Sequence, residues 1–113
     1  LPMPNSVSLE SLTKAAEADA RKAALLAQAR KRLAPVLYAD GPETLSALRL
    51  AAGLSQAQLA GRVSTSQSHI ARIERGQTDP STDVIARIAE ALGADEMRVY
   101  RAIRNQLATL GGM

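Results

Sequence analysis

The stretch that most constrains the fold of this chain runs from Leu54 to Gly76 and reads LSQAQLAGRVSTSQSHIARIERG. Its aliphatic residues recur at helical spacing in two short runs, and a tight turn is expected between them. Polar residues crowd the start of the second run. Two short helices with this pattern are typical of a small protein that presents a helix end to the major groove of DNA.

Capping signals mark where the two helices begin and end. Ser55 can cap the first helix, and Gln58 follows three residues later as its capping-box partner. The second helix is expected to begin near Ser66 and to stop at Gly76. The buried sides of the pair are then expected to consist of Leu59, Ala60, Val63, Ile70 and Ile73.

The composition of the whole chain favours helices packed on helices. The chain has 113 residues, of which 46% are hydrophobic, yet it contains no Phe and no Trp. A core built from Leu, Ile, Val and Ala must be compact, and closely packed helices achieve this better than a sandwich of sheets. We therefore expect an all-α protein with one domain and an appended segment.

The appended segment is predicted to be an Ala-rich helix from Ser8 to about Leu33. Pro35 should end this helix, because proline disfavours helix at the preceding residue and has no N–H of its own. A short apolar patch follows and is expected to dock on the domain. This patch consists of Val36, Leu37 and Tyr38.

A break at Asp40-Gly41-Pro42 is predicted to divide the N-terminal helical extension, residues 1–41, from the domain, residues 42–113. Five helices are expected in the domain: one over residues 43–52, the pair described above, and two more. Ser81 and Gly93 should bound the fourth helix, whose buried face is Val84, Ile85, Ile88, Ala89 and Leu92. The fifth is capped by Asp95 and stopped by Gly111-Gly112. Its apolar stripe either completes the core or meets a second subunit, and comprises Met97, Tyr100, Ile103, Leu107 and Leu110.

Charge and residue types narrow the function classes. The chain is only mildly basic, with 14 Lys and Arg against 11 Asp and Glu, but residues 54–76 carry three Arg and a single acid. With no Cys and one His, neither a metal nor another cofactor is expected, and no nucleophilic constellation points to an enzyme. No long apolar run or secretory signal is present, which favours a cytoplasmic protein without a membrane partner.

The polar start of the second helix is the candidate binding face. It comprises Ser66, Gln67, Ser68 and His69, with Arg72 one turn further on. Gln can make two hydrogen bonds to an adenine edge, and Arg can do the same to guanine. Ser hydroxyls and the N–H groups at a helix start suit phosphate oxygens. We therefore expect double-stranded DNA as the partner of this face.

With these residues at this spacing, LRLAAGLSQAQLAGRVSTSQSHIARIERGQTDPSTDVIARIAEALG resembles the lambda-repressor-like family, also called the Xre or Cro/C1-type helix-turn-helix domain. The resemblance covers roughly Leu45 to Tyr100. It includes the GLSQ-x-x-LA opening, the SQSHIARIERG reader helix and the PS-x-x-x-IARIAEALG helix. It implies a five-helix domain in which Gln67, Ser68 and Arg72 read bases.

The resemblance implies roles for other positions too. Gln56 matches a position that touches phosphate and props the reader Gln, and His69 matches a more variable position near backbone or base. Arg49 and Glu74 match an internal ion pair that ties the first helix of the domain to the third. Ser64 stands at a turn position that the family usually fills with Gly, and a positive φ there would cost Ser energy.

The expected function is that of a sequence-specific DNA-binding transcriptional regulator, a repressor acting as a homodimer on a palindromic operator. One reader helix makes few base contacts, and two half-sites about 34 Å apart would roughly double them. The alternative is an antitoxin similar to those of the HigA kind, which neutralises a small ribonuclease toxin and represses its own operon. Under either function, three roles stay open for the N-terminal helix: a solvated extension, a self-association surface or a docking segment for another protein.

Overall fold

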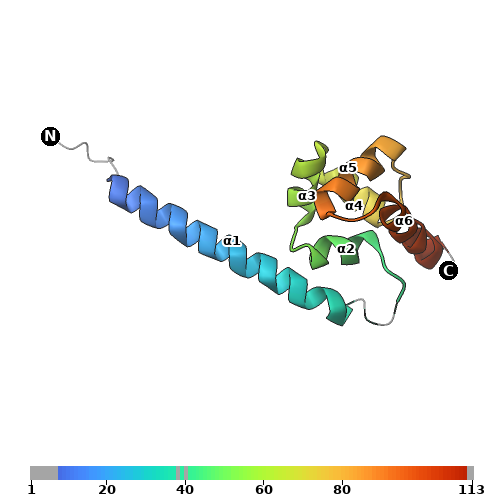
Figure 1. Cartoon of the computed structure of the whole chain (residues 1–113), viewed down its shortest axis with the longest axis horizontal. Coiled ribbons are helices and arrows are strands. Elements are labelled where there is room, and N and C mark those ends of the chain that lie inside the picture. Colours follow the sequence, from blue (N-terminus) through green and yellow to red (C-terminus); the bar gives the residue numbers. More distant parts are fainter. Residues whose placement is uncertain (1–7, 38, 40, 112–113) are drawn as a thin grey trace.

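In the computed structural model, residues 8–37, 39 and 41–111 are described, with side-chain surroundings up to Gln106. Over these residues the chain forms helices and no strand, so the all-α prediction is confirmed (Figure 1). Helices α2 to α6 form a rounded body, from which α1 projects as a long rod, and the longest dimension is 67 Å. The helices are α1 (Leu9–Leu37), α2 (Leu45–Ala51), α3 (Gln56–Val63), α4 (Gln67–Glu74), α5 (Thr82–Leu92) and α6 (Glu96–Gly111).

Side-chain caps start the four middle helices. The hydroxyls of Thr44, Ser55, Ser66 and Ser81 each accept a hydrogen bond from the backbone N–H three residues further on. The predicted capping box at Ser55 is confirmed, since the Gln58 side chain accepts from the Ser55 N–H at 2.9 Å. Thr44 was not predicted as a cap, and it starts α2 later than the expected residue 43.

Aliphatic side chains from all five helices of the body fill a single core. All residues predicted to face inward on α3 and α4 are buried in this core. On α5, Ile85, Ile88 and Ala89 are buried as predicted, and Val84 and Leu92 are partly buried against the core. Because no large ring must be accommodated, the helices pack closely around short branched side chains. The largest fully buried side chains are Leu45, Leu59, Val63, Ile70, Ile73, Ile88, Val99 and Ile103.

The predicted end of α1 is wrong, because the helix continues through Pro35 to Leu37. A proline in the last turn removes only one helical hydrogen bond, and the same turn contains Ala34, the one buried residue of α1 among those described. The predicted docking patch is wrong as well for the residues described. Val36 and Leu37 are 75% and 59% exposed, and Tyr38 lies outside the described residues.

The body holds α1 through a different set of residues, which contact α2 and the turn after it. Gly53 has a φ of +78°, and a Cβ placed there would lie 3.2 Å from the Cβ of Ala27 and 3.0 Å from Cε of Lys31. Glycine therefore allows the close approach of α1. The Arg30 guanidinium adds hydrogen bonds to the Gly53 carbonyl at 3.2 Å and to the Gln58 side chain at 3.3 Å.

The predicted stripe of α6 joins the core only in part, and its exposed part is the one that the alternative of a second subunit requires. Met97 and Tyr100 are exposed, whereas Ile103 is buried, and the side chains of Leu107 and Leu110 lie outside the described residues. The buried face is offset around the helix and consists of Val99, Ala102, Ile103 and Gln106. Because Gln106 is polar, the spacing of apolar residues alone does not reveal this face.

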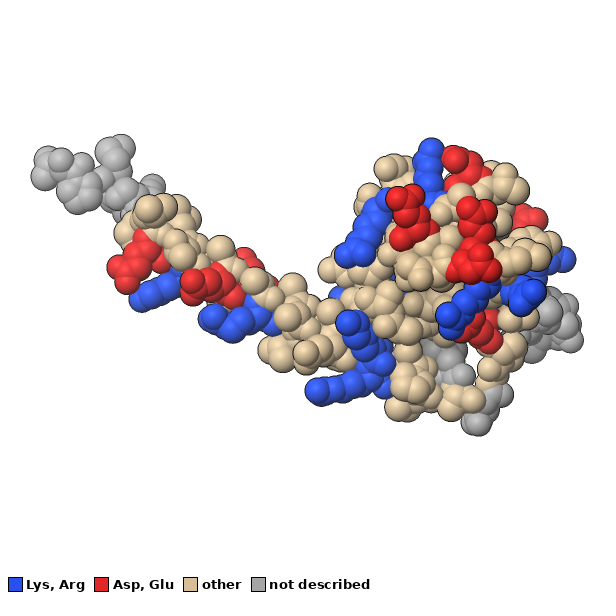
Figure 2. Space-filling model, viewed as in Figure 1, with Lys and Arg blue, Asp and Glu red and all other residues tan. Residues whose placement is uncertain are grey.

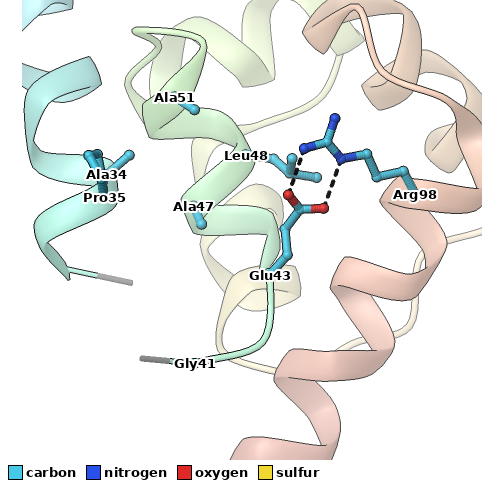
Figure 3. Close-up of a pocket in the computed structure, with 8 residues that line it drawn as sticks. All are labelled: Ala34, Pro35, Gly41, Glu43, Ala47, Leu48, Ala51 and Arg98. Carbon is cyan, nitrogen blue, oxygen red and sulfur yellow. Dashed lines mark hydrogen bonds and ion pairs between the residues drawn. The ribbon is translucent and has the colours of Figure 1, made fainter. Parts of the chain in front are cut away.

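An ion pair joins the segment before α2 to α6 (Figure 3). Arg98 donates to both carboxylate oxygens of Glu43, at 2.7 and 2.9 Å. The pair borders a hollow of about 310 Å³ that lies between α2 and the C-terminal end of α1. The Arg98 guanidinium lowers the pKa of the Glu43 carboxyl, although partial burial opposes this effect.

Acid is expected to weaken this ion pair. A lowered pKa in the folded state means that Glu43 stabilises the fold above the pKa of an unfolded glutamate, about 4.3, and that the contribution is lost as the pH falls through the folded pKa. Both side chains are more than a third exposed, so Glu43→Gln should cost less than about 1 kcal/mol at neutral pH. Urea unfolding between pH 7 and pH 2.5 measures this difference. The difference in unfolding free energy between the natural protein and Glu43→Gln should vanish at pH 2.5. A difference that persists there would mean that the charge of Glu43 is not its source.

Candidate nucleic-acid interface

Helices α3 and α4 are joined by a turn of three residues, 64–66. Ser64 adopts the left-handed conformation, with φ 61° and ψ 45°, and the Thr65 N–H donates to the Ala60 carbonyl at 2.9 Å. Ser64 is the one non-glycine residue in the described chain with a positive φ. The positive φ expected from the family resemblance is therefore present, and it is occupied by serine at a conformational cost.

Ser64→Gly is expected to stabilise the protein by up to about 1 kcal/mol. Glycine removes the steric cost of the left-handed conformation, while its greater freedom in the unfolded chain cancels part of the gain. The unfolding midpoint in urea measures this. Ser64→Ala is the matched control, because it keeps the Cβ and should bring no gain. If the glycine variant proved less stable than the alanine variant, the strain would not be real.

The outer face of α4 carries the predicted reading residues. Ile70 and Ile73 turn inward and are fully buried, and this orientation leaves Gln67, Ser68 and Arg72 exposed. Ser68 and Arg72 are four residues apart, so they lie on the same face of the helix. The first turn of α4 and the residue one turn later thus form one polar surface, as the sequence predicts.

Ser66, His69 and Gln56 are placed at the margin of this surface. The Ser66 hydroxyl accepts from the His69 N–H at 3.1 Å, which leaves its own proton available to another acceptor. His69 is half-buried. Gln56 is the first residue of α3, and its side chain meets that of Gln67, the first residue of α4. The predicted site residues are therefore brought together at the adjoining ends of two helices.

Beneath the surface, Glu74 receives four hydrogen bonds. Arg49 donates to it from Nε at 2.7 Å and from Nη2 at 3.1 Å, Ser46 from its hydroxyl at 2.7 Å, and Gln56 from Nε2 at 3.1 Å. The side chains of Arg49 and Glu74 are 11% and 5% exposed. The predicted ion pair between α2 and α4 is thus confirmed, and its carboxylate is saturated with donors.

The same network reaches the reader helix. Because Glu74 can only accept, it fixes which end of the Gln56 amide faces it, and the Gln56 Oε1 then points to Gln67. Gln67 donates to that oxygen from Nε2 at 3.4 Å. One N–H and the carbonyl oxygen of Gln67 stay free, and this donor and acceptor match the N7 and N6 positions of adenine.

Two further residues contribute hydrogen bonds to this arrangement and were not among the predicted site residues. Ser46 bonds Glu74, and buried Gln106 donates to the Ile73 carbonyl at the end of α4 while accepting from the Leu45 N–H at 3.4 Å. No periodic signal identifies either of them, since both are polar residues on apolar helix faces. Arg62, in the last turn of α3, and Arg75, directly after α4, are exposed cations of the same helix pair, and their charge in the sequence was the available signal.

A short helix pair with a tight turn, a buried aliphatic side and a polar outer face defines the helix-turn-helix class of DNA-binding proteins. A sequence profile for a helix-turn-helix domain matches residues 43–101, which is more than half of the chain. The chain belongs to this family, the Xre or lambda-repressor-like helix-turn-helix proteins. Its members bind DNA as regulators and are typically not enzymes. No curated protein matches the sequence.

No described helix is both long enough and apolar enough to span a bilayer.

Proposed function

We propose that this protein is a sequence-specific transcriptional repressor that binds a palindromic operator as a homodimer. The observation that carries the proposal is the hydrogen-bond network from Arg49 through Glu74 and Gln56 to Gln67. It orients one reader side chain before DNA arrives. Orientation in advance lowers the conformational entropy lost on binding, and such fixed geometry matters most for contacts that discriminate between bases.

The proposed roles follow from the chemistry of each side chain. Gln67 bonds an adenine edge and Arg72 a guanine edge, while Ser68 bonds a base or the adjoining backbone. Phosphate oxygens are held by Ser66, by the Gln56 backbone N–H at the start of α3, and by the basic side chains beside the reading face. His69, which is half-buried, lies at the edge of the contact.

A homodimer follows from the energetics of recognition. Each good bidentate base contact contributes about 1 to 3 kcal/mol of discrimination, and one eight-residue reader helix offers only a few such contacts. Two copies on one face of the duplex double the specific contacts. A bound repressor of this kind blocks a promoter by occupying it and needs no catalytic group.

Selection of bound duplexes from a random pool tests the proposal. The full chain is expected to enrich an inverted repeat whose half-site centres are about 34 Å, or 10 to 10.5 base pairs, apart, or a multiple of this distance. Reporter expression from a promoter that contains the selected site should fall when the protein is present. Recovery of unrelated sequences after repeated rounds would contradict the proposal. Increased expression would contradict the repressor assignment alone.

A further inference from the structure

The feature with no assigned role is the outer part of α1, which projects from the body into solvent (Figure 1). At steps of three and four residues, one side of the helix carries an apolar row whose leucines are exposed. Leu12 is 54% exposed, Leu26 46% and Leu33 47%. Two charged residues interrupt the row, Asp19 and Arg30. We call the whole row the α1 seam, and its apolar members are Leu12, Ala16, Ala23, Leu26, Leu33 and Leu37.

The α1 seam has the spacing of a coiled coil. Steps that alternate between three and four residues give a repeat of seven, which is the pattern by which two helices bury a shared apolar seam. Ala27 and Lys31, which approach Gly53 most closely, lie about a quarter turn around α1 from the seam, whereas the seam residue Arg30 donates to the body from Nη1. The seam and the body therefore share Arg30, whose Nε and Nη2 donors can still meet a carboxylate from a second helix.

Charge determines which occupant and which direction fit the seam. In a parallel pair, Asp19 would face the Asp19 of the second copy and Arg30 would face its Arg30, which gives two repulsive layers. In an antiparallel pair, Asp19 faces the second copy's Arg30. The same register sets Leu12 against Leu37, Ala16 against Leu33, and Ala23 against Leu26. Every apolar seam residue then meets an apolar one, and every charge meets its opposite.

The wider charge distribution along α1 agrees with this direction. Residues 9–19 carry three acids and one base, whereas residues 20–37 carry five bases and no acid. In Figure 2, acidic side chains accordingly appear only toward the free end of α1, and the part beside the body shows basic ones. Antiparallel pairing sets each acidic half against a basic half along about 39 Å of helix, from residue 12 to residue 37.

We therefore propose that a second copy of this chain binds the α1 seam, and that the two α1 helices pair antiparallel with Asp19 opposite Arg30 in two symmetric layers. The inference rests on the homodimer of the proposed function and names its interface. The twofold axis that relates the two α1 helices then lies beside each helix at the level between residues 24 and 25.

Charge variants of the full chain test the pairing by sedimentation equilibrium. Asp19→Arg places Arg against Arg in both layers, and the dimer dissociation constant should rise at least tenfold. Glu17→Arg is the matched control, because it changes the charge equally on the opposite side of α1 and should leave the dissociation constant nearly unchanged.

An equimolar mixture of the Asp19→Arg and Arg30→Asp chains should recover dimer formation, since both layers again join opposite charges. Far-UV circular dichroism checks that each variant remains helical.

Cysteine cross-linking tests the direction, and the natural chain has no Cys to interfere. A mixture of Ala16→Cys and Leu33→Cys chains should form a disulfide-linked pair on mild oxidation. Neither variant should cross-link alone, because two copies of residue 16 are about 25 Å apart in the antiparallel register. Efficient cross-linking of Ala16→Cys by itself would mean parallel helices and would overturn the proposal.

The outcomes separate this inference from the function on which it rests. If the chain binds its selected operator specifically but Asp19→Arg behaves like Glu17→Arg, the α1 interface is wrong and the DNA-binding function stands. If the α1 pair forms as expected but no specific DNA is bound, the function is wrong and the interface stands. A monomeric chain whose seam captures another protein, such as the ribonuclease toxin of the antitoxin alternative, would overturn the α1 pair.

Discussion

Arg49→Ala is expected to destabilise the protein by about 3 to 5 kcal/mol. The substitution leaves the Glu74 carboxylate buried without its charged partner, and a buried unpaired charge is costly. Folded domains of this size have about 5 to 15 kcal/mol of stability in total, so this one change removes a substantial share of it. Urea unfolding followed by circular dichroism measures the loss.

Two comparisons make this expectation specific. Arg104→Ala removes an exposed arginine from α6 and should change the free energy of unfolding by less than about 0.5 kcal/mol. Replacing both Arg49 and Glu74 with Met should cost less than the sum of the single replacements, because no charge is left without a partner. Additive losses would mean that the two residues do not act as a pair. Loss of DNA binding by Arg49→Ala says nothing about DNA contact, since the reader helix loses its support.

Gln67→Ala and Arg72→Ala are each expected to lower specific DNA affinity by about 1 to 3 kcal/mol per half-site while the fold survives. Both side chains are exposed and make no core contact, so the unfolding free energy should hardly change. Every 1.4 kcal/mol corresponds to a tenfold change in dissociation constant. Binding to a set of operators with single base-pair changes measures the effect at each position.

The informative result is the pattern over base pairs. Each variant should become indifferent to the identity of one base pair in each half-site, because the lost side chain no longer distinguishes it. Arg104→Ala serves again as the control, since it removes the same charge at an exposed position on α6. Uniform weakening on every operator would assign Gln67 or Arg72 to phosphate contact instead.

Most of the helix-turn-helix could be predicted from sequence because its signals are local. A capping hydroxyl and the spacing of Leu59, Val63, Ile70 and Ile73 depend on neighbours within one or two turns. The Arg49–Glu74 pair spans 25 residues and was predicted through the family resemblance. The structure adds the donors that saturate this carboxylate, which no local pattern specifies.

The failed predictions involve contacts between distant segments. Pro35 was expected to end α1, but the turn that contains it and buried Ala34 stays helical through Leu37. On α6, two stripes with helical spacing share Ile103, and the choice between them depends on which partners meet the helix. Burial of Gln106 favours the less apolar stripe, because this amide finds partners on α2 and α4.

The central claim is that α4 enters the major groove, and methylation interference on the selected operator tests it most directly. Methylation of guanine at N7 alters the major groove, whereas methylation of adenine at N3 alters the minor groove. N7 methylation within each half-site is expected to block binding, and N3 methylation there is expected to leave binding intact. Interference from N3 methylation alone, or from neither modification, would contradict a reader helix in the major groove.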